Sequence, residues 1–260
     1  MNYGFHLATT GAITGMRRLE TVANNLANSA TVGFKSDFLS MRARLPENLE
    51  RPGEYADTNT LLDGLGGGTL FDPTRIDLRQ GTLRQTKSQF DIAIEGDGFL
   101  RLENPAKGAG AKDMLLTRAG ALARSSNGTL VLATSGVPVL DQNGQRIVLD
   151  ADQPDLRIDE GGRVMQGGSE IARLAVVVPN DLRNLVKEGR DAMRLLGGRA
   201  ASAPDSTIVR QYHLEESTVD PVLSLAEMIK VSRGIEFSTR LMQAEDQATG
   251  RLIDTLGRFA

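Results

Sequence analysis

The sequence predicts an α+β protein in which discontinuous terminal helices, a coiled-coil-like assembly domain, bracket an antiparallel β-rich central domain. Three observations lead to this prediction: helical periodicity over residues 2–26, a heptad pattern over residues 223–256, and short apolar runs separated by turn residues between positions 81 and 178. The expected domains are 1–35 with 215–260 (helical assembly), 36–79 (irregular connector), 80–196 (β-rich), and 197–214 (linker and return strand).

Composition excludes several classes of function. The chain has 260 residues, is 40% hydrophobic and carries a net charge of −3, which permits a sizeable core and argues against nucleic acid as a partner. With no Cys and two His, disulfides and thiolate metal sites are excluded, and we expect no metal and no cofactor. No apolar run approaches the length of a membrane span, and the N-terminus lacks the pattern of a cleaved signal. We therefore expect no direct membrane insertion, and either a cytoplasmic protein or export without a classical signal.

The first segment has apolar residues at spacings of three or four, which indicates a helix that begins near Asn2. Gly11 and Gly15 each weaken such a helix by about 1 kcal/mol relative to Ala, so the helix needs a partner. The apolar positions are Phe5, Ala8, Ala12, Met16, Leu19, Ala23 and Leu26.

The end of this helix carries three amides within about one turn, at Asn24, Asn25 and Asn28. Side chains three and four positions apart share a helix face, so these amides are expected beside the apolar stripe. Gly33 then supplies the backbone freedom that a turn requires, and Phe34 re-enters an apolar environment.

The region 36–79 is less regular. Phe38, Met41 and Leu45 are spaced so that a helix could continue to Pro46, after which the glycine-rich run 64–68 indicates an irregular connector. A phosphate-binding loop is excluded there, because no helix follows the glycines.

The central region reads as antiparallel β structure, because Asn-Gly between apolar runs is a strong hairpin signal and occurs at 127–128 and 143–144. Residues 184–196 are expected to form a short amphipathic helix, and residues 197–204 a linker. The expected strands are 90–94, 98–102, 129–133, 137–140, 146–149, 156–158, 163–165 and 171–178.

Four carboxylates in this region, Glu95, Asp97, Asp141 and Asp159, could suggest glycoside hydrolysis, which uses paired carboxylates. Each lies in or beside a glycine-containing turn, where acidic residues are common. We therefore interpret them as turn residues. A calcium loop beginning at Asp141 is not supported, because position 152 is Asp instead of the required Glu.

The final helix has a clear start, with Asp220 as cap and Pro221 as first residue. Its heptad seam follows a four-three alternation through Leu225, Met228, Ser232, Ile235, Thr239, Met242, Asp246, Thr249, Ile253 and Leu256. A second apolar stripe makes the helix apolar on more than one face, so it is expected to need several neighbours: Phe237, Leu241, Ala244, Ala248 and Leu252.

Three groups of residues carry a family resemblance. The N-terminal residues Thr10-Gly11, Leu19, 22–28 and 31–35 resemble the signature of bacterial flagellar rod and hook proteins. Residues 80–83, Thr86, 90–99 and 117–120 are similar to the central motifs of that family, and residues 214–219 with 227–229 and Arg233 are similar to its C-terminal signature. The motifs span nearly the whole chain in the family's order.

The resemblance implies a structural subunit of the flagellar basal-body rod. Such subunits stack helically into the drive shaft that transmits torque, with terminal helices in the inner tube and β domains in the outer layer. The implied partners are the chain itself, other rod or axial proteins and the flagellar type III export apparatus. The implied location is the periplasm-spanning rod, reached without a cleaved signal peptide.

Within the family, Asp220-Pro221-Val222 looks more like the proximal-rod type than the distal-rod type. Ile235 is expected to enter the packed interior of the polymer instead of a core of the monomer. The expected assembly interface is Leu19, Ala23, Asn24, Asn25, Leu26, Asn28, Gly33, Phe34, Leu225, Met228, Ile235, Met242, Ile253 and Leu256.

Alternative functions remain open at this stage: a distal-rod or hook-type axial subunit, a β-rich surface binding module or adhesin, and a carbohydrate-active enzyme. A tether for an adhesin needs no helix that is apolar on two faces. An enzyme that binds sugar needs aromatic platforms, and the chain has no Trp and three Tyr. We therefore expect a structural protein without catalytic activity.

Overall fold

The computed structural model describes residues 3–45, 49, 66–105, 113–197, 199–204 and 206–257, except for the side chain of Leu256. The chain divides into two compact units. The helical unit comprises Met1–Ala27, Asp37–Ile76 and Asp220–Ala260, and the β unit comprises Asn28–Ser36 and Asp77–Val219. Residues 28–36 and 215–219, which the sequence grouped with the helices, therefore fold with the β unit.

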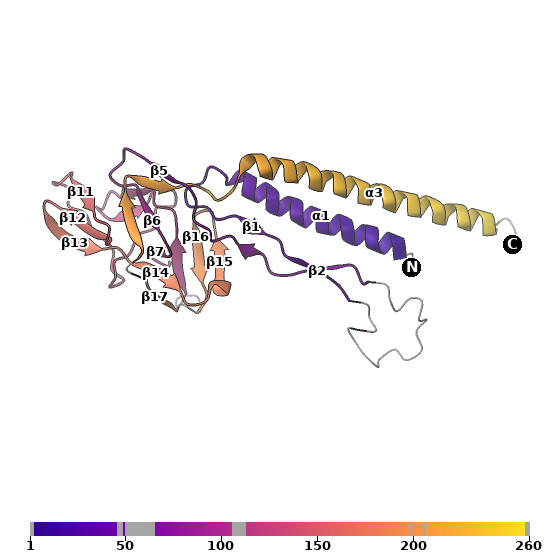
Figure 1. The fold of residues 1–260 in the computed structure, drawn as a ribbon, viewed down its shortest axis with the longest axis horizontal. Coiled ribbons are helices and arrows are strands. Elements are labelled where there is room, and N and C mark those ends of the chain that lie inside the picture. The colour runs from indigo at the N-terminus through magenta and orange to yellow at the C-terminus, as the bar shows by residue number, and fades with distance from the viewer. Residues whose placement is uncertain are drawn as a thin grey trace. The chain divides into compact units, whose positions relative to one another are not determined.

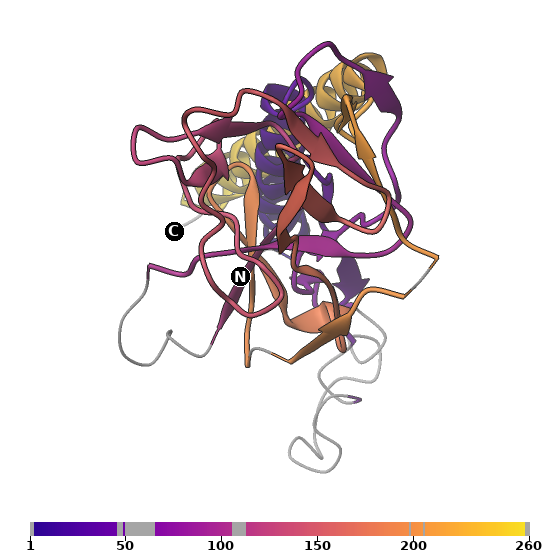
Figure 2. The same ribbon diagram turned by 90° about the vertical axis from the view of Figure 1, so that its left-hand side faces the viewer.

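The helical unit is built on two long helices, α1 (Tyr3–Ala27) and α3 (Pro221–Gly257), which lie side by side in both views (Figures 1 and 2). They run antiparallel, so that both chain ends lie at the same end of the pair (Figure 1). The predicted cap is confirmed, because Oδ1 of Asp220 accepts hydrogen bonds from the amides of Val222 (2.8 Å) and Leu223 (3.1 Å).

The two helices approach closely because small residues of α1 face α3. Ala8 and Ala12 are buried, and Val231 is buried on the α3 side. A Cβ atom placed on Gly15 would lie 2.6 Å from Cγ1 of Ile235, closer than real Cβ contacts. The glycine that weakens α1 as an isolated helix is thus required by its packing against α3.

This packing corrects one expectation. The side chain of Ile235 contacts Gly15 of the same chain, so Ile235 belongs to the monomer's own helix pair. Met242 likewise faces α1, since its sulfur accepts a hydrogen bond from the Thr9 hydroxyl (3.4 Å). The heptad seam of α3 is therefore used at least partly within the chain.

The rest of the described helical unit consists of two short antiparallel pairs: β1 (Asp37–Phe38) with β4 (Arg75–Ile76), and β2 (Met41–Ala43) with β3 (Thr69–Phe71). The helix expected through Phe38, Met41 and Leu45 is wrong. Asn25 explains part of the difference, because its side-chain amide donates to Asp37 O (2.7 Å) and accepts from Asp37 N (2.9 Å), which holds this segment extended. Of the expected connector 36–79, residues 46–48 and 50–65 lie outside the described residues.

The β unit contains a six-stranded antiparallel sheet in the order β15-β16-β8-β7-β14-β17, a three-stranded sheet β11-β12-β13, and the pairs β18–β6, β19–β5 and β10–β9. Its core is apolar and includes Ile92, Leu100, Leu130 and Val164. The strands are β5 (Leu83–Gln85), β6 (Ile92–Glu95), β7 (Phe99–Leu102), β8 (Met114–Thr117), β9 (Leu122–Arg124), β10 (Leu130–Leu132), β11 (Leu156–Ile158), β12 (Arg163–Gln166), β13 (Ser169–Arg173), β14 (Val176–Pro179), β15 (Leu185–Glu188), β16 (Ala192–Leu195), β17 (Ala200–Ser202), β18 (Ile208–Gln211) and β19 (His213–Glu215).

The helix expected at residues 184–196 is wrong, because this segment is the hairpin β15–β16, preceded by a short 3-10 helix, Leu182–Asn184. In β16 buried Met193 and Leu195 alternate with less buried neighbours, which is the period of a strand. The guanidinium of Arg194 also donates to the Glu188 carboxylate across the hairpin (2.5 Å for both bonds). Residues 200–202, part of the expected linker, form strand β17. The segments 137–140 and 146–149 were expected to be strands, but they form isolated β-bridges only.

The close approach at Gly15 leads to the first prediction. Gly15→Ala should lower the thermal stability of the helix pair, because the clash with Ile235 outweighs the gain of about 1 kcal/mol in helix propensity. Gly250→Ala is the matched control, because no atom lies within 4 Å of a Cβ there, and it should raise stability. Thermal unfolding followed by far-UV circular dichroism measures both. Equal stabilisation by the two variants would contradict the packing described.

Candidate assembly site

Three segments that are far apart in sequence meet at a buried ionic cluster in the β unit. Nζ of Lys35 lies 2.5 Å from Oε1 of Glu215, and a guanidinium nitrogen of Arg118 lies 3.3 Å from Oε2 of Glu215. The Lys35 and Glu215 side chains are 0% exposed. The N-terminal, central and C-terminal motifs are thus joined by one carboxylate. We call Lys35, Arg118 and Glu215 the buried cluster.

Backbone groups complete the coordination of Glu215. The amide of Gly81 donates to its carboxylate (2.9 Å), and the amide of Gly33 donates to its backbone carbonyl (2.8 Å). Gly33 has φ +67°, and a Cβ there would lie 2.5 Å from the backbone of Arg118 and Ala119. The predicted need for backbone freedom at Gly33 is therefore confirmed, and close packing adds a second reason for glycine.

The two cations have further partners. Lys35 donates to the carbonyl of Arg79 (2.5 Å), and Arg118 donates to the carbonyls of Ile94 (3.2 Å) and Gly96 (2.7 Å). The Arg118 guanidinium also lies over the Phe99 ring, 5.1 Å from its centroid. Burial lowers the pKa of Lys35, and the Glu215 carboxylate opposes that shift.

Phe34 lies in the same region and is buried. Nζ of Lys187 lies 3.8 Å from the centroid of its ring, and the Phe34 carbonyl accepts a hydrogen bond from the amide of Thr218 (3.1 Å). Thr218 also accepts from the Ser36 amide through its hydroxyl (2.9 Å). Residues 33–36 therefore serve contacts inside the chain.

The three predicted asparagines differ in their environment. Asn25 is buried and binds the backbone of Asp37, as described above. Asn24 is exposed, and the side chain of Asn28 accepts a hydrogen bond from the Thr31 hydroxyl (3.3 Å). The structure does not bring the three amides together as one surface.

The remaining predicted interface residues lie on the two helices. Leu225 and Ile253 are exposed on α3, whereas Met228, Ile235 and Met242 are half-buried. On α1, the predicted residues Leu19, Ala23 and Leu26 are also half-buried. The side chain of Leu256 lies outside the described residues.

The predicted interface omitted the buried cluster and Phe237 of α3. Lys35, Arg118 and Glu215 stood within the motifs, but no local pattern indicates which of them pair. Phe237 stood in the second stripe of α3, and its side chain is 69% exposed. Its position in an apolar stripe, away from the heptad seam, was the available signal.

Three of the four turn carboxylates, those of Glu95, Asp141 and Asp159, have hydrogen-bond or ion-pair partners within the chain. Oδ1 of Asp141 accepts from the amides of Asn143 (2.9 Å) and Gln145 (2.6 Å), and Asp159 binds both the amide and the side chain of Arg163. Glu95 forms an ion pair with Arg210. The backbone carbonyl of Asp97 accepts from the Thr207 hydroxyl (2.6 Å). These contacts stabilise turns and strand pairs, as the structural interpretation predicted.

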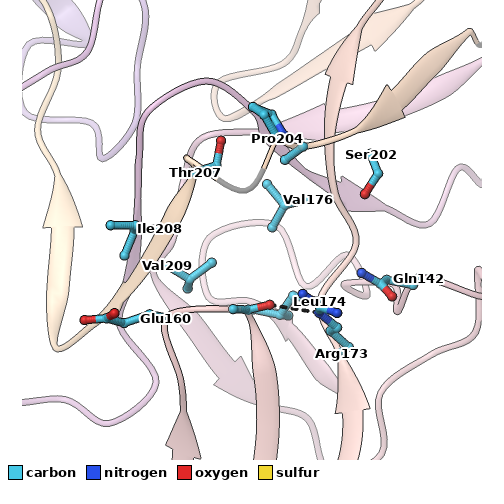
Figure 3. A pocket seen from close by; sticks show the side chains of 12 residues that line it. Gln142, Glu160, Arg173, Leu174, Val176, Ser202, Pro204, Thr207, Ile208 and Val209 are labelled. Atoms are coloured by element: carbon cyan, nitrogen blue, oxygen red, sulfur yellow. Dashed lines mark hydrogen bonds between the residues drawn. The ribbon is translucent and has the colours of Figure 1, made fainter.

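The β unit also has an open cleft of about 330 Å3. Figure 3 shows Val176 and Val209 in the middle of its lining, with Glu160 and Gln142 at opposite sides of the view. Arg173 is turned to the Gly161 carbonyl, to which it donates (2.9 Å).

Within the described ranges, no group of three His, Asp or Glu side chains is placed to hold a metal ion, and no helix is long and apolar enough to cross a bilayer.

These features define a class of structural protein, in which the chain termini form an antiparallel helix pair and a separate β unit ties the terminal motifs together. Comparison with known families identifies it further. Residues 6–35 match the family of flagella basal body rod proteins, residues 93–166 the D1 domain of flagellar hook proteins FlgE/F/G, and residues 210–255 the C-terminal region of flagellar basal body rod FlgEFG proteins.

Full-length relatives agree. The chain is 28% identical to the flagellar basal-body rod protein FlgF of Caulobacter vibrioides over 100% of both chains, and 27% identical to FlgF of Rhizobium meliloti over 99% of both. It is 26% identical to the rod protein FlgG of Caulobacter vibrioides, over 92% of this chain and 94% of that one. The chain belongs to the flagellar basal-body rod protein family, and it is a structural subunit of the basal-body rod. The proximal-rod prediction agrees with the FlgF relatives.

The buried cluster leads to the second prediction. Glu215→Gln should destabilise the β unit by about 3–5 kcal/mol, because two buried cations lose their carboxylate. Lys35→Met should cost less, because Arg118 and the Gly81 amide still compensate Glu215. Urea unfolding of the purified chain measures both free energies.

Glu103→Gln is the control for a lost ion pair, because it breaks the exposed pair with Arg146 and should change stability far less. If Lys35→Met were as harmful as Glu215→Gln, the assignment of Glu215 as the shared centre would be wrong.

Proposed function

We propose that this subunit polymerises helically through α1 and α3 and forms part of the drive shaft that transmits torque. Its proposed partners are further copies and other rod or axial proteins. The observation that carries the proposal is the exposed apolar surface of the helix pair. On the described parts of α1 and α3, thirteen large apolar side chains are exposed: Tyr3, Phe5, Leu7, Ile13, Met16, Val222, Leu223, Leu225, Ile229, Phe237, Leu241, Leu252 and Ile253.

Apolar surface of this extent favours association, because each Å² removed from water stabilises the complex. The exposed residues do not form a single stripe. Leu225 and Ile229 lie on one side of α3, whereas Phe237 and Leu241 lie on another, as the period of 3.6 residues per turn requires. Contacts between two different surfaces of identical subunits are heterologous, and heterologous contacts that do not close produce helical polymers.

The proposed interface accordingly differs from the one expected from sequence. Leu225 and Ile253 are retained, and Phe237 with Leu241 is added. Asn25, Gly33 and Phe34 are instead proposed to act within the chain, where they hold the segments that follow α1. This assignment is supported by the burial of Gly33 and Phe34 and by the hydrogen bonds of Asn25.

The length of α3 suits a mechanical role. Its 37 residues extend about 55 Å at 1.5 Å per residue, so one helix can contact several neighbours along a polymer. We further propose that the flagellar type III apparatus exports the chain without a cleaved signal peptide and that the subunit resides in the periplasm-spanning rod.

The turn carboxylates Asp97, Asp141 and Asp159 are proposed to have no catalytic role.

The third prediction tests polymerisation through exposed apolar residues. Phe237→Asp should leave the thermal unfolding of the monomer unchanged, because the side chain is already exposed. It should abolish incorporation into the rod and hence motility, because burial of a Phe side chain contributes about 1.5–3 kcal/mol at each contact and a buried carboxylate adds a desolvation cost. Motility and basal-body composition are measured in cells whose only copy carries the substitution.

Two controls accompany this prediction. Phe237→Leu keeps an apolar side chain and should remain motile. Val231→Asp places a carboxylate in the helix pair of the monomer and should lower its thermal stability as well as motility. Normal assembly of the Phe237→Asp subunit would contradict the proposed function.

A further inference from the structure

The chain contains two Asn-Gly pairs, at 127–128 and 143–144, and the structure places them in two turns of the same kind. In each turn the glycine amide donates to the carbonyl three residues earlier, at Ser125 and at Asp141 (2.9 Å in both). The amide of that earlier residue donates to the carbonyl four positions later (2.9 and 2.8 Å). Both glycines have φ +78°. The two turns therefore have matching backbones, and a difference between their asparagines must come from side chains.

Asn-Gly is a chemically labile pair, because Asn can lose its side-chain amide and glycine has no side chain to shield its backbone nitrogen. That nitrogen attacks Cγ of the preceding Asn. Its proton passes through solvent to the side-chain amide, which leaves as ammonia, and a cyclic succinimide forms. Water then opens the ring at either carbonyl to give Asp or isoaspartate. The reaction needs no enzyme and no oxidant, but the Asn side chain must be free to turn to the glycine nitrogen.

Asp141 restrains the asparagine of the second turn. Its Oδ1 accepts from the backbone amide of Asn143 (2.9 Å), and its Oδ2 accepts from the side-chain amide of the same residue (3.4 Å). The same Oδ1 also accepts from the amide of Gln145 (2.6 Å). Asn143 is thus held at two points by a carboxylate, and movement of its Cγ to the Gly144 nitrogen requires breaking these hydrogen bonds.

The first turn lacks this restraint, because Ser125 stands where the second turn has Asp141. Asn127 is exposed. Among the described residues, neither its backbone amide nor its side chain has a hydrogen-bond partner. The side chain of Asn127 is therefore free to sample the rotamers from which its Cγ approaches the next nitrogen.

Charged groups of both signs lie near each turn. Beside the second turn are the guanidinium of Arg101 and, around an open hollow, Glu170 and Arg173. Beside the first turn is Arg124, which donates to the carbonyl of Asp150 (3.4 Å). Local charge therefore does not single out either asparagine, and the hydrogen bonds inside the second turn distinguish them.

We propose that Asn127 is a site of spontaneous deamidation in the folded chain and that Asp141 protects Asn143 from the same reaction. The site matters to the fold because Gly128 is buried and its carbonyl accepts from the Leu149 amide (2.8 Å). An isoaspartate at position 127 adds a methylene to the main chain next to this contact, in the turn that joins β9 to β10. Modified subunits are therefore expected to unfold at a lower temperature.

One tryptic peptide of the full chain reports both sites, because residues 125–146 contain no Lys or Arg before the last position. The purified chain is incubated at neutral pH and digested, and the Asp and isoaspartate at each position are measured by mass spectrometry with fragmentation. We expect Asn127 to deamidate about tenfold faster than Asn143 in the folded chain, the factor that corresponds to losing one or two hydrogen bonds. In urea the two sites should react at similar rates.

A reciprocal exchange of the first turn residue tests the role of the carboxylate. Ser125→Asp should slow deamidation of Asn127, and Asp141→Ser should accelerate deamidation of Asn143, each by about tenfold. Loss of overall stability does not imitate this result, because global unfolding exposes both sites and moves their ratio towards one. Equal rates in the folded chain, a faster reaction at Asn143, a difference that persists in urea, or a ratio that neither substitution changes would overturn the inference.

Discussion

The carboxylate of Glu215 is the constraint on which the rest of the β unit depends. It has no access to water, and it is compensated by two cations and one backbone amide contributed by residues 35, 118 and 81. A buried charge of this kind is tolerated only when its partners are all in place, because an incomplete set leaves an uncompensated ion in a medium of low dielectric constant. The cluster therefore specifies how segments separated by up to 180 residues come together.

The buried cluster also holds the two segments of the chain that adjoin the terminal helices. Residues 28–36 follow α1 directly, and residues 213–219 precede α3. Both segments are held inside the β unit, by Lys35 and Glu215 and by the backbone bond between Gly33 and Glu215. Gly33 and Phe34, which the sequence placed at an interface, thus make contacts within the subunit, and the proposed association between subunits is assigned to the outer surfaces of α1 and α3.

The sequence predicted those elements that depend on interactions between residues a few positions apart in the chain. The cap at Asp220, the turn at Gly33 and the two terminal helices were predicted because capping, backbone freedom and helical periodicity act over a few residues. The hairpin at 185–195 was mistaken for a helix, because short apolar segments fit both periods until their neighbours are known. Phe38 and Met41 were assigned to a helix for the same reason, although Asn25 holds this region extended.

The candidate site was less predictable. No spacing pattern reveals that Lys35 pairs with Glu215, since the pairing depends on the completed fold. Ile235 and Met242 of the α3 seam contact α1, but sequence alone could not decide whether Ile235 meets its own chain or another. Gly15 decides this question, because its missing side chain is what admits Ile235.

Hydrogen exchange of the purified chain tests the central role of the buried cluster most directly. The amides of Gly33, Gly81 and Thr218, which donate to Glu215 or to Phe34, should exchange only when the whole β unit unfolds. Their protection should therefore match that of the central strands β7 and β8. Exchange of these three amides through local opening, with β7 and β8 still protected, would contradict the account.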